Sequence, residues 1–225
     1  MNVLEVLRGG LIVSVQAEGG SELNAPETIA LLCRVAVANG AVGVRVEGLS
    51  RIAAAVRAVS VPVIGLVKRR YEGFLPYISP SGRELAEIAA AGAAAAAFDA
   101  TGRPRPDGRD VTAVVAEIHR RGLLAVADCA AVADVRAAAA AGCDALATTL
   151  CGYTDATRGE PLPALGLVRA CAGAGRFAIC EGGIGDPGAL CAAFAAGADA
   201  AVVGTALTNV DALVRRFAAA TPRAG

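Results

Sequence analysis

Residues that can transfer protons follow two apolar runs of the sequence. Lys68 is the single lysine among 21 basic residues, and arginine fills the other positions, including Arg69 and Arg70 directly after it. A partly desolvated lysine can release its proton, whereas arginine keeps its own. Glu181 ends another apolar run, and a carboxylate there can act as an acid, as a base or as a hydroxyl-binding group. Lys68 therefore predicts chemistry that needs a neutral amine, with Glu181 as a second candidate.

Two glycine-bearing segments indicate a phosphate site. Gly182 and Gly183 follow Glu181, and Gly204 and Thr205 follow a later apolar run. Glycine lets the backbone turn sharply and approach a ligand closely, and backbone N–H groups at the start of a helix bind phosphate. Tight turns alone are the alternative explanation. Two such segments after neighbouring strands favour phosphate binding.

The elements that must position these residues are eight short apolar runs separated by alanine-rich helical stretches. The runs lack polar alternation, as expected of strands buried on both faces of a parallel sheet. They cover residues 11–15, 42–46, 61–67, 94–98, 123–127, 145–147, 177–180 and 200–203. Helical stretches meet a glycine before the next run at Gly40, Gly92, Gly142 and Gly197, which is typical of a left-handed helix cap.

This order predicts a single (β/α)8 TIM barrel of the phosphate-binding type, spanning residues 1–225, since about 200–250 residues suffice for that fold. An open doubly wound sheet is the alternative, although no G-x-G-x-x-G follows the first strand. In a barrel, the carboxyl ends of the strands surround the active site. The polar residues at these ends are Gln16, Arg45, Glu47, Lys68, Asp99, Asp128, Thr148, Thr149 and Glu181.

Three further features of the sequence are two aspartates, one long loop and one charged helix. Asp99 and Asp128 can each be functional or structural, and Asp99 can cap the next helix. The aromatic, proline-bearing segment 69–81 is long enough to close over a site. A helix is predicted over 110–121, with Glu117, Arg120 and Arg121 on its solvent side. His119 lies in that helix before a strand begins, so we expect it on the surface at the opposite end of the barrel.

Composition excludes several classes of function. The 21 acidic residues balance the 21 basic ones, which leaves no electrostatic footprint for nucleic acid or an anionic membrane. One histidine rules out a multi-histidine metal site, and no metal is expected. No uncharged stretch approaches the roughly 18 residues of a membrane span, and Glu5 and Arg8 interrupt any signal peptide. Seven cysteines without C-x-x-C predict reduced thiols in a cytoplasmic protein.

Several segments together resemble one known family. They are GLIVSVQA at 10–17, GVRVEG at 43–48, PVIGLVKR at 62–69, YISPS at 77–81, FDATGRPRP at 98–106, ADC at 127–129, TTLCGYT at 148–154, CEG at 180–182 and VVGTA at 202–206. Through them the chain resembles the bacterial N-acetylmannosamine-6-phosphate 2-epimerases of sialic-acid catabolism. The resemblance runs from residue 10 to about residue 209, and the segments around Lys68, Arg103 and Tyr153 are the most specific.

The resemblance implies interconversion of N-acetylmannosamine 6-phosphate and N-acetylglucosamine 6-phosphate. It assigns Lys68 and Glu181 as the catalytic pair. It places Gln16, Arg45, Asp128, Tyr153 and Thr154 against the sugar, and Gly182, Gly183, Gly204 and Thr205 against the phosphate. The family usually has arginine at the positions of Gly183 and Asn209, so the preference for a phosphorylated substrate stays open.

Epimerisation at C2 fits these residues, because a base can remove the proton next to an open-chain C1 aldehyde and an acid can return it. This chemistry needs neither a metal nor a nicotinamide, so no cofactor is expected. Two alternatives stay open: a Schiff-base aldolase that uses Lys68, and a sugar-phosphate-binding barrel with weak or no activity. The alanine-rich helices leave a homodimer open as well.

Overall fold

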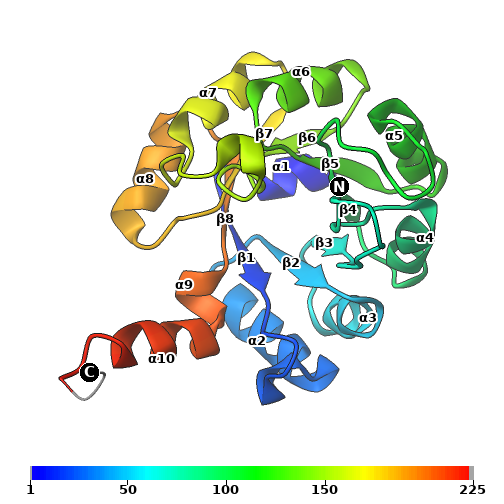
Figure 1. The fold of residues 1–225 in the computed structure, drawn as a ribbon. Coiled ribbons are helices and arrows are strands. Elements are labelled where there is room, and N and C mark those ends of the chain that lie inside the picture. The colour runs from blue at the N-terminus through cyan, green and yellow to red at the C-terminus, as the bar shows by residue number, and fades with distance from the viewer. Residues whose placement is uncertain (1, 223–225) are drawn as a thin grey trace.

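Eight parallel strands form a closed barrel, with helices around its outside, in the computed structural model, which describes residues 2–222 (Figure 1). The strands are β1 (Leu11–Val15), β2 (Gly43–Glu47), β3 (Val63–Leu66), β4 (Ala95–Asp99), β5 (Leu124–Asp128), β6 (Ala145–Ala147), β7 (Phe177–Glu181) and β8 (Ala200–Val203). The barrel closes where β1 pairs with β8, with Leu11 opposite Ala201. This pairing confirms the predicted TIM barrel and excludes the open doubly wound sheet.

The strand boundaries agree with the sequence prediction to within two residues. The predicted strands 11–15, 145–147 and 200–203 match in full. Four carboxylates expected at or just beyond a strand end prove to be the last residues of their strands: Glu47, Asp99, Asp128 and Glu181. Their positions are therefore set by the hydrogen-bonded ladder of the barrel rather than by a loop.

Ten helices surround or close the barrel in the described part of the chain. They are α1 (Val3–Leu7), α2 (Pro26–Ala38), α3 (Leu49–Ala58), α4 (Gly82–Ala90), α5 (Val111–Arg120), α6 (Val132–Ala140), α7 (Leu165–Gly173), α8 (Pro187–Ala195), α9 (Thr205–Thr208) and α10 (Val210–Ala218). Short 3-10 turns cover Glu22–Asn24 and Asp155–Thr157. Several helices begin at a side-chain cap, such as Asp110 for α5 and Asp186 for α8, which satisfies backbone N–H groups that lack a helical partner.

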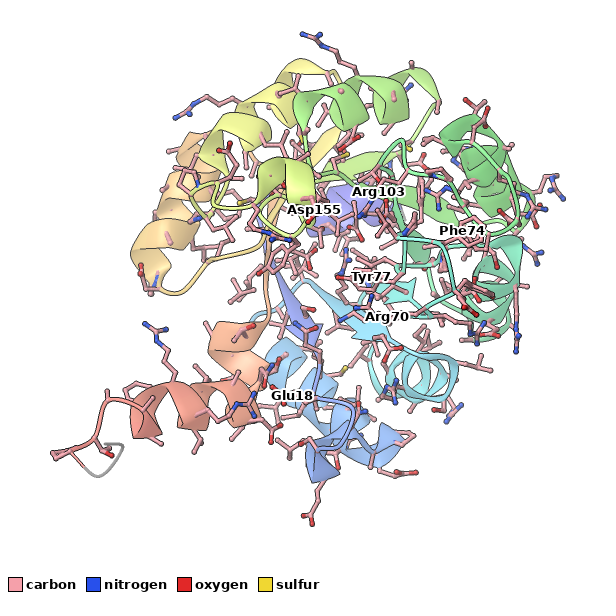
Figure 2. The ribbon with its side chains drawn as sticks, viewed as in Figure 1. Glu18, Arg70, Phe74, Tyr77, Arg103 and Asp155 are labelled. Atoms are coloured by element: carbon pink, nitrogen blue, oxygen red, sulfur yellow. The ribbon has the colours of Figure 1, made fainter. Side chains whose placement is uncertain are left out.

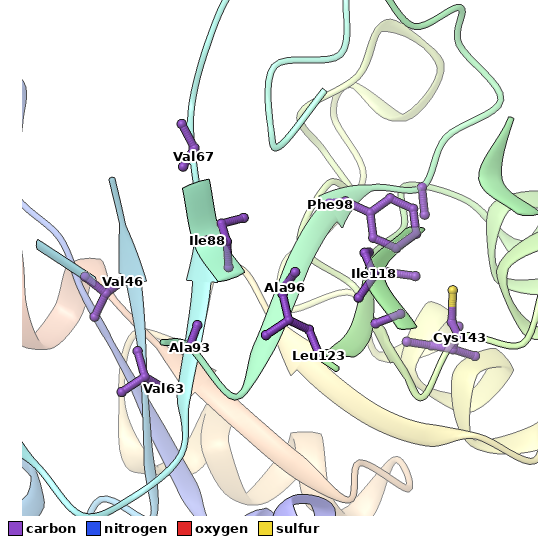
Figure 3. Packing of buried hydrophobic residues seen from close by; sticks show 14 of the residues in the cluster. Val46, Val63, Val67, Ile88, Ala93, Ala96, Phe98, Ile118, Leu123 and Cys143 are labelled. Atoms are coloured by element: carbon purple, nitrogen blue, oxygen red, sulfur yellow. The ribbon is translucent and has the colours of Figure 1, made fainter. Parts of the chain in front are cut away.

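The core has two layers that match the small residues of the sequence. Inside the barrel, side chains such as Ala97, Ala147 and Ala200 pack with larger ones, and Leu7 of α1 belongs to the same cluster as Phe177. Between strands and helices, a second layer includes Ala96, Phe98, Ile88, Ile118 and Leu123 (Figure 3). Alanine on the strands lets the helices lie close to the barrel, so the alanine-rich composition follows from packing.

The predicted helix–glycine–strand repeat is present. Gly40, Gly92, Gly142 and Gly197 have φ angles of +100°, +80°, +88° and +102°, which is the left-handed conformation that glycine adopts without a steric penalty. Each of these glycines ends a helix and turns the chain into the next strand at the amino-terminal end of the barrel. The opposite end is left for longer segments that carry side chains over the barrel mouth.

One prediction about the helix over 110–121 is wrong. Glu117 does not face solvent: only 5% of its side chain is exposed, and it forms ion pairs with Arg120 and Arg121. The guanidinium groups of Arg120 and Arg121 pair with its carboxylate and so neutralise a charge that is largely buried. His119 is exposed, as predicted, and its Nε2 lies 2.8 Å from Asp144 Oδ2.

The seven cysteines are all free thiols, six of them buried and Cys191 exposed. Burial raises the pKa of Cys33, Cys143 and Cys171 to about 12, so these thiols pack as small apolar groups. Across residues 2–222, no helix is long and apolar enough to span a membrane, and no group of three metal-ligating side chains occurs.

Candidate active site

A pocket of about 460 Å³ lies at the carboxyl ends of the strands. Nine of the residues predicted for the site line it: Gln16, Arg45, Lys68, Tyr153, Glu181, Gly182, Gly183, Gly204 and Thr205. They come from segments far apart in the sequence, and the closed barrel brings them together. Asp128 and Thr154, the other two, are not part of its lining.

A buried network of one guanidinium and two carboxylates forms the floor of this pocket. Arg45, 3% exposed, donates to both carboxylate oxygens of Asp128, with Nη1 3.0 Å from Oδ1 and Nη2 2.7 Å from Oδ2. The same Nη1 lies 3.0 Å from Glu181 Oε2. The Thr149 hydroxyl lies 2.7 Å from Asp128 Oδ1 and 3.2 Å from Glu181 Oε2. Two carboxylates therefore share a single buried positive charge.

This arrangement changes the proton affinity of its members. Burial raises the pKa of Glu181 to about 7, and the charge of Asp128 adds to this effect, while Arg45 and the Thr149 hydrogen bond oppose it. Burial alone would lower the pKa of Arg45, but Asp128 and Glu181 raise it above its ordinary value, so the guanidinium stays charged. Glu181 can consequently gain or lose a proton near neutral pH.

Lys68 follows β3 and is fixed through its backbone. Its N–H lies 3.3 Å from Glu47 Oε1, and the residue forms an antiparallel bridge with Ile78. The side chain is open to solvent through the pocket, and it also borders a second hollow of about 430 Å³. The pocket walls and the positive charge of Arg45 lower the pKa of Lys68, although nearby carboxylates oppose this shift. A larger fraction of neutral amine follows.

The predicted loop 69–81 folds back beside this lysine. The Arg69 N–H donates to the Tyr77 carbonyl at 2.9 Å, and the Ser79 N–H donates to the Val67 carbonyl at 2.8 Å. Tyr77 lines the pocket, and the Arg70 guanidinium lies 5.0 Å from the centre of its ring (Figure 2). The loop thus forms one wall of the pocket beside Lys68.

Glycine is required at one point of the pocket lining and packs closely at a second. Gly183 has φ +74°, and a β-carbon there would lie 2.3 Å from the Cβ of Leu162, so the position has no room for a side chain. A β-carbon at Gly204 would lie 2.8 Å from Gln16 Nε2, the end of a flexible side chain, and 3.2 Å from Ser14 Cβ. Both glycines present backbone rather than side chains to the pocket.

The two predicted residues outside the lining have other contacts. Asp128 is completely buried beneath Arg45, and its carboxylate is occupied by Arg45 and Thr149. Thr154 is 7% exposed, and its hydroxyl lies 2.8 Å from the hydroxyl of Thr157. In this structure the two side chains are covered by their neighbours, so neither one can touch a sugar in the pocket directly.

Asp99 has a structural role that the sequence did not indicate. Its carboxylate accepts hydrogen bonds from the Thr101 N–H at 3.0 Å, the Thr101 hydroxyl at 2.6 Å and the Arg103 guanidinium at 2.5 Å. The helix-cap explanation is wrong, because α5 begins at Val111 and Asp110 caps it. Asp99 instead holds the turn that carries Arg103.

The pocket lining also includes residues that had no role assigned from the sequence, among them Glu47, Tyr77, Thr149 and Arg216. Glu47 and Thr149 stood at strand ends, which was a usable signal. Tyr77 lies inside one of the resembling segments. Arg216 gave no signal, because its approach to the pocket depends on how α10 leaves the barrel.

These features define an enzyme of the (β/α)8-barrel class, in which acid–base groups with shifted pKa values stand at the carboxyl ends of the strands. Residues 29–223 match the family described as "Putative N-acetylmannosamine-6-phosphate epimerase" (NanE). The chain therefore belongs to the N-acetylmannosamine-6-phosphate epimerase family, as its resemblance predicted.

Individual relatives agree with this membership. A Synechococcus elongatus protein named "Putative N-acetylmannosamine-6-phosphate 2-epimerase" is 42% identical over 221 residues, which are 96% of this chain and 95% of that protein. A similarly named Salmonella paratyphi A protein is 41% identical over 203 residues, 90% of this chain and 87% of its own. The solved structure of the N-acetylmannosamine-6-phosphate 2-epimerase from Clostridium perfringens has a TM-score of 0.93 and 32% identity, covering 97% of this chain and 96% of that one.

Proposed function

We propose that this chain interconverts N-acetylmannosamine 6-phosphate and N-acetylglucosamine 6-phosphate by removing and returning the proton at C2. The observation that carries the proposal is the placement of Lys68 and Glu181 in one pocket with pKa values shifted in opposite directions. An amine with a lowered pKa and a carboxyl with a raised one each approach the range where general acid–base catalysis is efficient. Family membership supports the choice of substrate.

The proposed reaction begins on the open-chain sugar, whose C1 aldehyde makes the C2 proton acidic. Neutral Lys68 removes that proton, and an enolate-like species forms with negative charge on O1. A proton then returns to the opposite face of C2. In one case protonated Glu181 gives its proton to C2, and Lys68 keeps the proton that it removed. In the other case Glu181 gives a proton to O1 and takes it back, and the Lys68 ammonium returns the proton to C2 after the enol has turned its other face. A pKa of about 7 suits Glu181 to both tasks.

Arg45 and Asp128 support this chemistry in different ways. The Arg45 guanidinium borders the pocket, and it can donate to a sugar oxygen through an N–H that Asp128 and Glu181 do not use. Asp128 lies behind it and holds the guanidinium with two hydrogen bonds. We therefore assign Asp128 as a positioning residue that acts through Arg45. Gln16 and Tyr153 border the same space as further contacts for the sugar.

The test is NMR of the protein with N-acetylmannosamine 6-phosphate in deuterated water. We expect N-acetylglucosamine 6-phosphate with deuterium at C2. A purified, folded protein that gives neither product nor exchange at C2 contradicts the proposal. Glu181→Gln separates the two roles of the carboxyl: retained exchange without epimerisation places it at C2, and loss of both places it at an oxygen.

A Schiff-base mechanism makes a different prediction for Lys68. Under the proton-transfer mechanism, borohydride added with substrate leaves Lys68 unmodified, because no imine forms. Mass spectrometry of the peptide that contains Lys68 measures this directly. An adduct of the mass of the reduced sugar phosphate assigns Lys68 to covalent catalysis instead.

Three broader expectations belong with this proposal. We propose that the chain works as one domain over residues 1–225, in the cytoplasm, where sugar phosphates occur and thiols stay reduced. The alanine-rich helices leave both a monomer and a homodimer open, and sedimentation velocity at several concentrations decides between them. Limited proteolysis that yields one stable fragment of nearly full length supports the single domain.

A further inference from the structure

Arg216 on α10 is a pocket residue that the proposed reaction does not use. Arg45, Lys68 and Arg216 are the arginine and lysine side chains in the lining of the 460 Å³ pocket, within residues 2–222. Arg216 lies on one face of α10 with Ala212 and Leu213, at helical spacings of four and three residues, and all three line the pocket. The face of α10 that carries Arg216 therefore borders the pocket.

The positive charges of the other two side chains, Arg45 and Lys68, are balanced by nearby carboxylates or are not needed in the proposed reaction. Arg45 is neutralised by Asp128 and Glu181. Lys68 is proposed to work as a neutral amine, and carboxylates lie near its charged form. Arg216, by contrast, has no ion-pair partner among the residues that the structure describes, whereas the adjacent Arg215 pairs with Glu18.

The pocket segments that follow β7 and β8 are suited to bind an anion. Gly182, Gly183 and Gly204 supply backbone without side chains to the same lining, and Thr205 follows them at the start of α9. Glu47 and Glu181 are the carboxylates of the described lining, and both are held by arginines, Glu47 by Arg51. A dianion in the pocket therefore meets one unpaired positive side chain.

We propose that Arg216 binds the phosphate group of the substrate and sets the preference for the phosphorylated over the unphosphorylated sugar. This inference rests on the proposed epimerase function and adds a specificity-determining residue to it. A guanidinium matches phosphate oxygens with two parallel N–H donors. Because α10 carries the guanidinium over the pocket, the position of that helix becomes part of substrate recognition.

The experiment compares Arg216→Gln with the wild type and with Arg215→Gln as a matched control. Arg215 is the neighbouring charge on the same helix and lies outside the pocket lining. For N-acetylmannosamine 6-phosphate, we expect Arg216→Gln to raise KM about 10- to 100-fold, the effect of one charged hydrogen bond. We expect kcat to change less than about threefold, because the contact is present before and during the reaction.

Three readouts make the outcome decisive. The activity of Arg216→Gln with unphosphorylated N-acetylmannosamine should equal that of the wild type, and Arg216→Lys should recover part of the lost KM effect. An unchanged KM in Arg216→Gln, or an equal loss with the unphosphorylated sugar, overturns the inference. Inorganic phosphate, titrated by calorimetry, tests the site without turnover: weaker binding to Arg216→Gln than to Arg215→Gln supports it even if the wild type proves not to be an epimerase.

Discussion

Replacing Glu181 by glutamine should stabilise the protein above neutral pH while it abolishes epimerisation. The reason is the burial of this carboxylate beside Asp128, which raises the pKa of Glu181 from 4.5 to about 7 in the folded protein. A raised pKa means that the folded state favours the protonated form. The contribution of Glu181 to the free energy of unfolding is fully present below pH 4.5 and is lost as the pH rises through about 7.

The size of the effect follows from the shift. Each pKa unit corresponds to about 1.4 kcal/mol, so a shift of this size lowers the free energy of unfolding by about 3 kcal/mol between pH 4.5 and pH 8. The side chain is 13% exposed, so solvent screening removes little of it. Glutamine resembles the protonated carboxyl in shape and has no charge to bury. The two proteins should therefore be equally stable near pH 4.5 and differ by about 3 kcal/mol at pH 8.

Urea unfolding of wild type and Glu181→Gln at pH 5 and pH 8 measures this difference. Glu72→Gln provides the control, because Glu72 is an exposed loop residue and its replacement should change stability equally at both pH values. Equal stability of wild type and Glu181→Gln at pH 8, or a difference that does not grow with pH, would refute the claim that burial raises the pKa of Glu181.

Three other predictions concern neighbouring positions. Lys68→Met should lower kcat/KM about 10²- to 10⁴-fold, and Lys68→Arg should not restore it, since arginine keeps its proton; steady-state assays of both variants decide this. Thr149→Val removes a hydrogen bond that lowers the pKa of Glu181. The part of the pH–rate profile that Glu181 governs should therefore move to higher pH, and an unmoved profile contradicts the assignment. Gly183→Ala should destabilise more than Gly182→Ala in thermal unfolding: both have positive φ, but a β-carbon at Gly183 would lie 2.3 Å from that of Leu162, whereas at Gly182 nothing is closer than 4.0 Å. The extra loss should be about 1–3 kcal/mol.

The fold could be predicted because its signals are local and repeated. Each strand of a parallel barrel is a short apolar run, and several helices end at a glycine in the left-handed conformation, such as Gly92 or Gly142. Errors arose where tertiary packing decided the outcome. Glu117 has the charge and spacing of a solvent-facing residue, yet its side chain is buried and pairs with two arginines.

Membership of the site was predictable for a related reason. Strand ends in a barrel must converge, so a list of strand-end side chains is already a list of neighbours. The list does not say which of these side chains is buried and which one faces the pocket. Asp128 and Glu181 stand at equivalent ends of β5 and β7, but one carboxylate lies beneath Arg45 and the other faces the pocket. The sequence holds no information on that order, since it depends on which carboxylate the guanidinium covers.

The two positions where the family usually has arginine show how local packing changes the source of charge in a pocket. At Gly183 the backbone turn leaves no room for any side chain, because Leu162 fills the adjacent space. At Asn209 the side chain accepts from the Ala212 N–H and caps α10. That cap starts the helix whose inner face carries Arg216 to the pocket. An uncharged cap at residue 209 and a cation at residue 216 are thus linked by two turns of one helix. If Arg216 binds the phosphate as we propose, this helix supplies the positive charge that residues 183 and 209 lack.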